Sequence, residues 1–532
     1  MGILGVLINL ADLDSDKTFD CDVCIVGAGV AGQTLAMSLV EKGIDVLLCE
    51  SGKRDFDPEI QTLAEGRNIG ETYYDLHTSR LRLFGGTAAI WGGRCAELDP
   101  IDFETRDYVP HSGWPISKKT LDPYYKKMFD QLGLERPGND GLWERINQTR
   151  PPFNSERLSP GLWCFDENGE RFTDPNRGSL KNVRTLLQAT LSELDVAENG
   201  EVQAAQFSNL SDKIATVKAK RYVLAAGAME TVRLLMGAVP ARPDGFGNAH
   251  DQLGRFFMEH PHARGGQILA TNMAQAIRSL PRALRVRGRR YAAYLRPSEI
   301  LQRKAGILNS SLSFAPRRHE GLKIDPVRAT KDKLKHDLPS TKFWRMLYKS
   351  AKNIGIKGRE LTDPWPTVRK LKRKPDTFGL YAVIRAEQAP NPDSRLLLSN
   401  ERDAAGLRRL DFDWQLQDID KRSVRVLMET LDSEFKNLGW GEIIPAAWIN
   451  EPEIIWNFDP LISSHSIGGY HHMGGTRMSG SAKTGVVDEN CRLYESPNLY
   501  VASSSVFPTG GWANPTVTIM ALADRLGDHL AG

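Results

Sequence analysis

The fold of this chain is decided by residues 22–32, which read Asp22-Val23-Cys24-Ile25-Val26-Gly27-Ala28-Gly29-Val30-Ala31-Gly32. The first half is a short apolar run rich in β-branched residues, which predicts a buried strand. The second half is the glycine pattern G-x-G-x-x-G, and residues 33–42 after it place apolar side chains on one helical face. Residues 44–50 predict a second strand that ends in an acid. This order is typical of a dinucleotide-binding fold.

The glycines and the acid of this unit have separate expected roles. Gly27 permits the tight turn, Gly29 lets the backbone approach a pyrophosphate, and Gly32 lets the helix pack on the strand. The phosphates would then lie at a helix N-terminus. Glu50 stands 18 residues after Gly32 and is expected to bind the ribose hydroxyls. The motif alone does not separate FAD from NAD.

A second element of the same fold is predicted at residues 218–227, which read KAKRYVLAAG. An apolar strand there runs into the small residues Ala226 and Gly227, and a helix is expected directly after them. Because this segment lies far along the chain from residues 22–50, the dinucleotide domain is predicted to be discontinuous.

Residues 83–94, LFGGTAAIWGGR, form a loop with four glycines and two alanines. Such small residues allow the backbone to approach a flat ligand closely, or simply leave a loop flexible. The large side chains within the loop favour a packed loop against a ring system. The cofactor contacts expected from it are Gly85, Gly86, Thr87, Ile90, Trp91 and Gly92.

Two further glycine-rich stretches lie near the C-terminus: residues 470–478, YHHMGGTRM, and residues 508–516, PTGGWANPT. A lone histidine in such a loop is more often a hydrogen-bonded loop residue than a base, and Asn514 suits a turn before Pro515. The predicted nucleotide site near the N-terminal end of the chain makes a catalytic role for these residues the favoured interpretation. Together with it, His471 and Asn514 suggest a redox enzyme.

The bulk composition sets limits on the class of protein. A length of 532 residues favours two domains, and 41% hydrophobic with 25% charged residues is ordinary for a soluble globular protein. A net charge of +3 does not suggest a nucleic-acid partner. No apolar run is long enough for a transmembrane helix. Six scattered cysteines fit reduced thiols, so a cytoplasmic location is expected.

Two short patterns have a functional and a plainer interpretation. Cys21-x-x-Cys24 has the spacing of a redox dithiol, but its place in an apolar run favours buried strand residues. His260 and His262 of the segment His260-Pro261-His262 could be a pair of metal ligands, but no cluster of Cys, Asp or Glu residues accompanies them. We expect a loop near the cofactor or substrate there, and no metal.

The middle of the chain is expected to form a substrate domain. Residues 377–386 and 407–414 predict half-buried strands, and residues 423–438 predict an amphipathic helix. Residues 301–375 contain 20 Lys or Arg against 6 Asp or Glu. A solvated insertion is the plainer interpretation; the alternatives are an acidic partner, an anionic membrane surface, a mobile lid, an oligomer contact or a docking site for an electron acceptor.

With these motifs in this order, the chain resembles the glucose–methanol–choline (GMC) oxidoreductase family. The motifs are GAGVAG with Glu50, GGTAAIWGG, VLAAGAMET, HHMGGTRM and ANPT. The C-terminal motifs and residues 387–395, EQAPNPDSR, are most similar to pyranose oxidases and to bacterial sugar or glycoside oxidases and dehydrogenases.

The resemblance implies an α/β protein with an α+β substrate part. A discontinuous, Rossmann-like FAD-binding domain would comprise residues 15–110, 180–270 and 456–532. A substrate-binding domain, built on a mainly antiparallel sheet backed by helices, would comprise residues 111–179 and 271–455.

Family positions carry over residue by residue. His471 matches the catalytic base, with His472 beside it as the alternative, and Asn514 matches the second active-site residue. Pro515 and Thr516 would contact the flavin. Some pyranose oxidases bind flavin covalently through a histidine of the glycine-rich loop; Ile90 stands at that place, so non-covalent FAD is expected.

The implied reaction is oxidation of a secondary alcohol of a sugar or glycoside to a ketone, with O₂ or another acceptor taking the electrons. His471 would take the hydroxyl proton while a hydride passes to flavin N5. The alternatives are a GMC enzyme acting on a non-sugar alcohol, such as a sterol or secondary metabolite, and a flavin-fold binding protein without catalysis. A homo-oligomer is compatible with the sequence.

Overall fold

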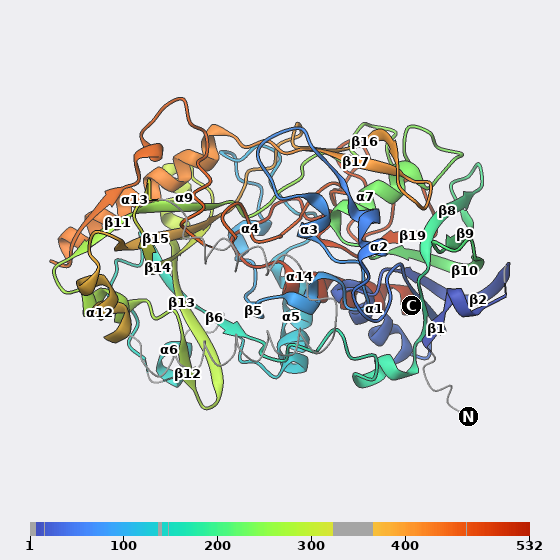
Figure 1. The fold of residues 1–532 in the computed structure, drawn as a ribbon, viewed down its shortest axis with the longest axis horizontal. Coiled ribbons are helices and arrows are strands. Elements are labelled where there is room, and N and C mark those ends of the chain that lie inside the picture. The colour runs from blue at the N-terminus through green and yellow to red at the C-terminus, as the bar shows by residue number, and fades with distance from the viewer. Residues whose placement is uncertain (1–6, 15, 137–140, 147, 323–364, 464) are drawn as a thin grey trace.

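The computed structural model describes residues 7–14, 16–136, 141–146, 148–322, 365–463 and 465–532. Its two large sheets lie on opposite sides of the molecule, the first on the right and the second on the left of Figure 1. The central part of the basic segment 301–375 falls outside the described residues. None of the described helices is long and apolar enough to cross a bilayer.

The first sheet has the order β1-β7-β3-β2-β10-β9-β8, and β19 also pairs with β10. Its centre is parallel, and β8 and β9 add an antiparallel edge. The predicted strand, helix and strand are confirmed as β2, α1 and β3. The strands are β1 (Leu7–Asn9), β2 (Lys17–Val26), β3 (Val46–Glu50), β7 (Arg184–Leu187), β8 (Thr190–Val196), β9 (Val202–Ser208), β10 (Ile214–Leu224) and β19 (Leu499–Val501).

Burial explains why these segments form the core of the first sheet. Val23 and Ile25 of β2 and Leu48 of β3 are fully buried, as the apolar runs predicted. Helix α1 (Val30–Val40) buries Leu35 and Leu39 on the same cluster and packs against the C-terminal helix α14 (Thr516–Ala531). The last helix of the chain is therefore fixed beside the first glycine turn.

The second sheet has the order β18-β11-β15-β14-β13-β6-β5, with β12 paired to β13, and the strand pairs among its described residues are all antiparallel. Helix α13 (Asp418–Asn437) packs on β18, β11 and β15, which confirms the predicted antiparallel sheet backed by a helix. The strands are β5 (Arg94–Cys95), β6 (Leu158–Phe165), β11 (His262–Ala270), β12 (Leu284–Val286), β13 (Arg289–Pro297), β14 (Ser310–Arg318), β15 (Phe378–Ala386) and β18 (Gly441–Pro445).

A small third sheet joins distant parts of the chain. It has the order β16-β17-β4, from β16 (Arg395–Arg402), β17 (Arg408–Asp413) and β4 (Gly66–Asn68). The strand expected near residues 407–414 is thus present, but it pairs here and not in the second sheet. Strands β5 and β11 lie within ranges expected for the FAD-binding domain, and both pair in the second sheet.

The longest of the remaining described helices is α5, with 15 residues. Helices α9 and α12 flank the undescribed part of the basic segment. The helices are α2 (Pro58–Gln61), α3 (Leu76–Ser79), α4 (Pro100–Phe103), α5 (Lys118–Leu132), α6 (Leu142–Arg145), α7 (Ala228–Gly237), α8 (Met273–Ser279), α9 (Glu299–Ala305) and α12 (Trp365–Arg373).

Candidate active site

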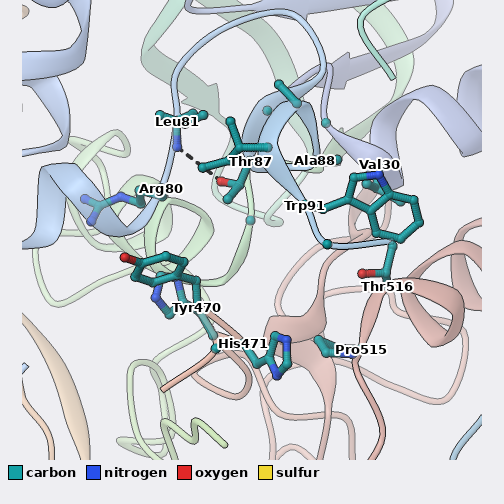
Figure 2. Close-up of a pocket in the computed structure, with 18 of the residues that line it drawn as sticks. Val30, Arg80, Leu81, Thr87, Ala88, Trp91, Tyr470, His471, Pro515 and Thr516 are labelled. Atoms are coloured by element: carbon teal, nitrogen blue, oxygen red, sulfur yellow. Dashed lines mark hydrogen bonds between the residues drawn. The ribbon is translucent and has the colours of Figure 1, made fainter. Parts of the chain in front are cut away.

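One cavity of about 2480 Å³ is lined by residues of both large sheets. Its volume exceeds the roughly 300–1,000 Å³ that suffice for a drug-sized ligand. It extends from the glycine turn after β2 to the two C-terminal glycine-rich loops. Figure 2 shows Thr87, Trp91, His471 and Thr516 around this cavity. The cavity is thus large enough for a dinucleotide and a second molecule.

The glycine turn has the geometry of a nucleotide cradle. Gly27 has a φ of +108°, and a Cβ there would lie 2.6 Å from the carbonyl oxygen of Ala225 at the end of β10. A Cβ on Gly32 would lie 1.9 Å from the Gly27 carbonyl oxygen, so only glycine lets α1 approach the turn. Gly29 has nothing within 4 Å of that position and lines the cavity.

A helix terminus and a second glycine-rich loop complete this cradle. Gly29 is the N-cap of α1 and has no side-chain cap, so the first N–H groups of the helix are available to an anion. The Gly85 N–H donates to the Ala28 carbonyl at 2.9 Å, and a Cβ on Gly86 would lie 3.2 Å from the Gly29 Cα. The two loops therefore touch, and a flat or phosphorylated ligand fits along them.

Glu50 lies at the end of β3 and lines the same cavity. Its carboxylate accepts from the Ala28 N–H at 2.9 Å and from the Gly52 N–H at 2.8 Å. Burial raises the pKa of Glu50, and these N–H donors oppose that rise. A carboxylate held in this way keeps further lone pairs for the hydroxyl groups of a ribose.

The two C-terminal loops meet at the other end of the cavity. The side-chain amide Nδ2 of Asn514 lies 2.9 Å from Nε2 of His471, although the residues are 43 positions apart. Pro515 follows Asn514 directly and is the N-cap of α14. Both His471 and Asn514 are half-buried and line the cavity. The packing of α14 on α1 therefore holds this pair near the glycine turn.

His260 fixes the proton positions on His471. The Gly511 carbonyl can only accept, so His260 Nε2, at 2.8 Å from it, carries a proton. In a neutral ring His260 Nδ1 is then a lone pair, and it lies 2.8 Å from Nδ1 of His471. His471 Nδ1–H must donate to it, which leaves the lone pair of His471 on Nε2. The amide of Asn514 donates to that lone pair.

The surroundings of His260, His471 and His472 favour the neutral form of each imidazole ring. Burial, then the neighbouring histidines and Arg385, hold the pKa of His471 well below its usual value. Burial lowers the pKa of His260 to about 4 and that of His472 to about 3. The three imidazoles are therefore neutral at neutral pH, each with one N–H, and His471 is available as a proton acceptor.

The loop that carries His471 is anchored on a buried carboxylate, Glu259. Its side chain accepts from the backbone N–H of His260 at 2.8 Å and of His471 at 2.9 Å. The hydroxyl of Tyr73 donates to the same carboxylate at 2.7 Å and lies 2.9 Å from Nε2 of His472. Burial raises the pKa of Glu259 to about 7, against these donors. His472 is thus held on Tyr73, while His471 faces Asn514.

Comparison with known proteins agrees with this geometry. Residues 22–329 match the FAD dependent oxidoreductase family, and residues 390–523 match the GMC oxidoreductase C-terminal family. The chain belongs to the FAD-dependent GMC oxidoreductases.

Individual relatives cover nearly the whole chain. The fructose dehydrogenase large subunit of Gluconobacter japonicus is 21% identical over 97% of this chain and 98% of its own. The paromamine 6'-oxidase of Streptomyces fradiae is 25% identical over 98% of this chain and 92% of its own. The solved pyridoxine 4-oxidase of Mesorbium loti has 17% identity and a TM-score of 0.53, covering 96% of this chain and 99% of that one. The last likeness shows the fold alone.

This GMC oxidoreductase therefore uses FAD and acts on CH–OH groups. The structure places most of the predicted cofactor residues on the wall of the cavity. Gly32 and Gly85 are exceptions, since they support the cradle from behind through Gly27 and Ala28. Those that line the cavity are Gly27, Gly29, Glu50, Gly86, Thr87, Ile90, Trp91, Gly92, Ala226, Gly227, Pro515 and Thr516.

Neither Glu259 nor Tyr73 was singled out from the sequence. Glu259 directly precedes the His260-Pro261-His262 pattern, and an acid in that apolar surrounding is a signal that the sequence does contain. Tyr73 has no comparable signal.

Among the described residues no group of three or more His, Cys, Asp or Glu is placed to hold a metal ion. Cys21 and Cys24 are free thiols of strand β2; Cys24 is buried as predicted, whereas Cys21 is half-buried.

Proposed function

We propose that this GMC oxidoreductase oxidises a secondary alcohol of a sugar or glycoside to a ketone, with His471 as general base. One observation carries the proposal: the chain Gly511, His260, His471 leaves a lone pair on His471 Nε2 at the cavity wall, beside Asn514. The names of two relatives, which refer to fructose and paromamine, support a sugar-type substrate.

In this mechanism the substrate hydroxyl replaces the Asn514 amide at the single lone pair of His471 Nε2, and Nε2 then takes the hydroxyl proton. The positive charge that develops on the ring is stabilised because His471 Nδ1–H already donates to His260. Asn514 donates its amide to the substrate oxygen and holds the carbon toward the flavin side of the cavity. Bound FAD supplies the hydride acceptor. General-base help of this kind contributes roughly 10²–10⁴-fold to a rate.

His471 suits the role better than its neighbour. The ring of His472 is held at Nε2 by the hydroxyl of Tyr73 and packs near Phe257. Its function in this proposal is to hold the loop, together with Glu259. We further propose a division into two domains along the two large sheets, in which β5 and β11 belong to the substrate-binding domain and not to the expected FAD-binding ranges, with the reaction taking place where the cavity joins the sheets.

The test is anaerobic reduction of the bound FAD, followed near 450 nm, over a panel of sugars, glycosides and non-sugar alcohols. Methyl β-glucoside and its 6-deoxy analogue form the decisive pair, since the analogue has only secondary ring hydroxyls. Reduction by both, with a keto-sugar product, supports the proposal. Reduction by the glucoside alone indicates a primary alcohol, and reduction only by sterols or other non-sugar alcohols rejects the sugar assignment. Reoxidation with O₂, quinone and dye acceptors side by side then separates oxidase from dehydrogenase.

A further inference from the structure

The wall of the cavity on the second sheet carries a group of arginines, which we call the arginine wall: Arg94, Arg290 and Arg385. They come from β5, β13 and β15 respectively and all line the cavity. Arg94 and Arg290 lie over the ring of Phe165, with their Cζ atoms 5.4 and 4.1 Å from its centroid. Three separate strands thus deliver guanidinium groups to one place.

A second aromatic ring continues the same surface. Trp163 stands two positions before Phe165 on β6, so both side chains lie on one face of the strand. The Cζ atoms of Arg94 and Arg385 lie 5.4 and 5.6 Å from its ring centroid. Stacking of this kind leaves the N–H edges of a guanidinium group available to a ligand.

The charges of Arg94 and Arg385 are not neutralised by the part of the chain that the structure describes. Neither side chain forms an ion pair or hydrogen bond there, and Arg94 Nε and Arg385 Nη1 are buried polar atoms without a partner. Burial, and then the neighbouring arginines, hold the pKa of Arg94 well below its usual value; burial lowers that of Arg385 to about 10.

Arg106 is an example in this protein of a buried arginine whose charge is neutralised by a carboxylate. Arg106 is fully buried, and both its Nη atoms bind the carboxylate of Glu387, at 2.9 and 2.6 Å. An unpaired buried charge costs far more than a paired one. Arg94 and Arg385 are half-buried and lose less hydration than Arg106, but no carboxylate of the described residues offsets that loss, so the cavity wall presents two positive charges to an anion from outside the protein.

The carboxylates near the arginine wall do not supply that anion. Asp166 binds Arg171, and Glu167 binds Arg285 at 2.7 Å. Glu170 and Asp174 also line the cavity and are exposed to solvent. In the described part of the chain, none of these four carboxylates forms a hydrogen bond or an ion pair with Arg94 or Arg385.

The arginine wall lies beside the proposed base and not at the phosphate cradle. Arg385 pairs across the strands with His262, two positions after the His260 that binds His471. Its charge is among the causes that lower the pKa of His471. The cradle of Gly27 and Gly29, in contrast, belongs to the first sheet.

We propose that the substrate carries an anionic group, a carboxylate or a phosphate, which binds Arg94 and Arg385 while a hydroxyl of the same molecule meets His471. The substrate class is then a sugar acid, a uronide or a sugar phosphate. A protonated amine at the same position is disfavoured by the two positive charges. This inference rests on the proposed function, since it takes the substrate to be a sugar.

The experiment compares matched substrates with the FAD-loaded enzyme. Methyl β-glucuronide and glucose 6-phosphate are set against methyl β-glucoside and glucose, and kcat/KM for FAD reduction is measured for each. Charge-assisted binding predicts a preference of roughly tenfold or more for one anion. The carboxylate and phosphate arms show which anion it is. Equal values for the charged and neutral members of both pairs overturn the inference.

Three variants assign any preference to the arginine wall. Arg94→Gln and Arg385→Gln should each lower the ratio of anionic to neutral kcat/KM roughly tenfold. Arg289→Gln is the matched control, because Arg289 is exposed on β13 next to Arg290 and does not line the cavity. It should leave the ratio unchanged. An unaltered ratio in Arg94→Gln and Arg385→Gln, with lost FAD content or a shifted flavin midpoint potential, would mean that these arginines serve the cofactor and would overturn the inference.

Binding measured without turnover separates this inference from the proposed function. Methyl β-glucuronide and glucose 6-phosphate are titrated against protein fluorescence, with Trp163 at the site as the reporter. If the anions bind saturably, if this binding is lost in Arg385→Gln, and if no sugar reduces the FAD, the anion site is supported and the sugar-oxidation proposal is rejected. If sugars reduce the FAD but neither anion binds, the sugar-oxidation proposal is supported and the anion site is rejected.

Discussion

Replacement of His260 tests whether the proton positions in the site matter. His260→Phe keeps a planar ring but removes both nitrogen atoms, and with them two hydrogen bonds of 2.8 Å, to His471 Nδ1 and to the Gly511 carbonyl. Without an acceptor at Nδ1, His471 no longer gains from the tautomer that leaves Nε2 free.

The size of the effect follows from the lost acceptor. An unsatisfied buried donor costs about 1–3 kcal/mol. If that energy no longer favours the productive tautomer, its population falls relative to the other one by roughly five- to 150-fold. The rate constant of FAD reduction should fall by up to this factor, because it follows the fraction of the productive tautomer; KM should change little, because His260 does not itself line the cavity.

The assay is stopped-flow reduction of FAD under anaerobic conditions, with FAD content and unfolding temperature measured on the same preparations. His260→Gln is the conservative partner, since its amide oxygen can still accept from His471 Nδ1–H. Partial recovery of the rate in His260→Gln, at a similar unfolding temperature, supports the tautomer argument. A His260→Phe enzyme that retains FAD and reduces it at the wild-type rate would refute it.

Four further predictions concern the same site. His471→Ala should retain FAD but reduce it roughly 10²–10⁴-fold more slowly; an unchanged rate rejects His471 as the base. Glu259→Gln should slow FAD reduction and lower the unfolding temperature, because the amide nitrogen must face one of the N–H or O–H donors now bound to the carboxylate; Tyr73→Phe, which removes one donor only, should have the smaller effect on both readouts. Because the pKa of His471 is lowered, its neutral form persists as pH falls through 6.5, so kcat/KM of the Glu259→Gln variant, which lacks the carboxyl of pKa about 7, should stay flat there; a loss of its activity centred at the ordinary histidine pKa would contradict this. Acid precipitation should release all the FAD into the supernatant, since Ile90 replaces a linking histidine; yellow colour in the pellet would show a covalent bond.

The same lowered pKa values bear on stability. In the folded state His260 stays neutral down to about pH 4, whereas in the unfolded chain it binds a proton near 6.5. The unfolded state therefore holds more protons in that window, and the contribution of His260 to the unfolding free energy falls as pH is lowered from 6.5 towards 4. The neutral histidines of the proposed catalytic site therefore lower the stability of the folded protein in acid.

Much of the fold could be predicted because local patterns determine it. The run from Asp22 to Gly32 specifies a strand and a turn through β-branching and glycine, and both are local properties. Partners in the sheets could not be predicted in the same way. Strand β17 was expected from its alternation, yet its pairing with β4, more than 300 residues earlier in the chain, depends on tertiary packing.

The residues of the site also fall into two groups, those that stand in a local sequence motif and those that only tertiary contacts bring together. His471 and Asn514 were predictable because each stands in a short glycine-rich motif. Glu259 and Tyr73 act through contacts between segments 186 positions apart, which no local pattern encodes. Arg94 and Arg385 likewise come from different strands, and only the second sheet brings them to the same aromatic surface.

The hydrogen bonds around the proposed base form a closed ring, and this closure explains why the two loops act together. Asn514 binds His471, His471 binds His260, and His260 binds the carbonyl of Gly511, which is joined to Asn514 by three peptide bonds. A shift of any one member must strain the others. The site is therefore organised before substrate arrives, and the substrate hydroxyl has only to replace the Asn514 amide at His471 Nε2.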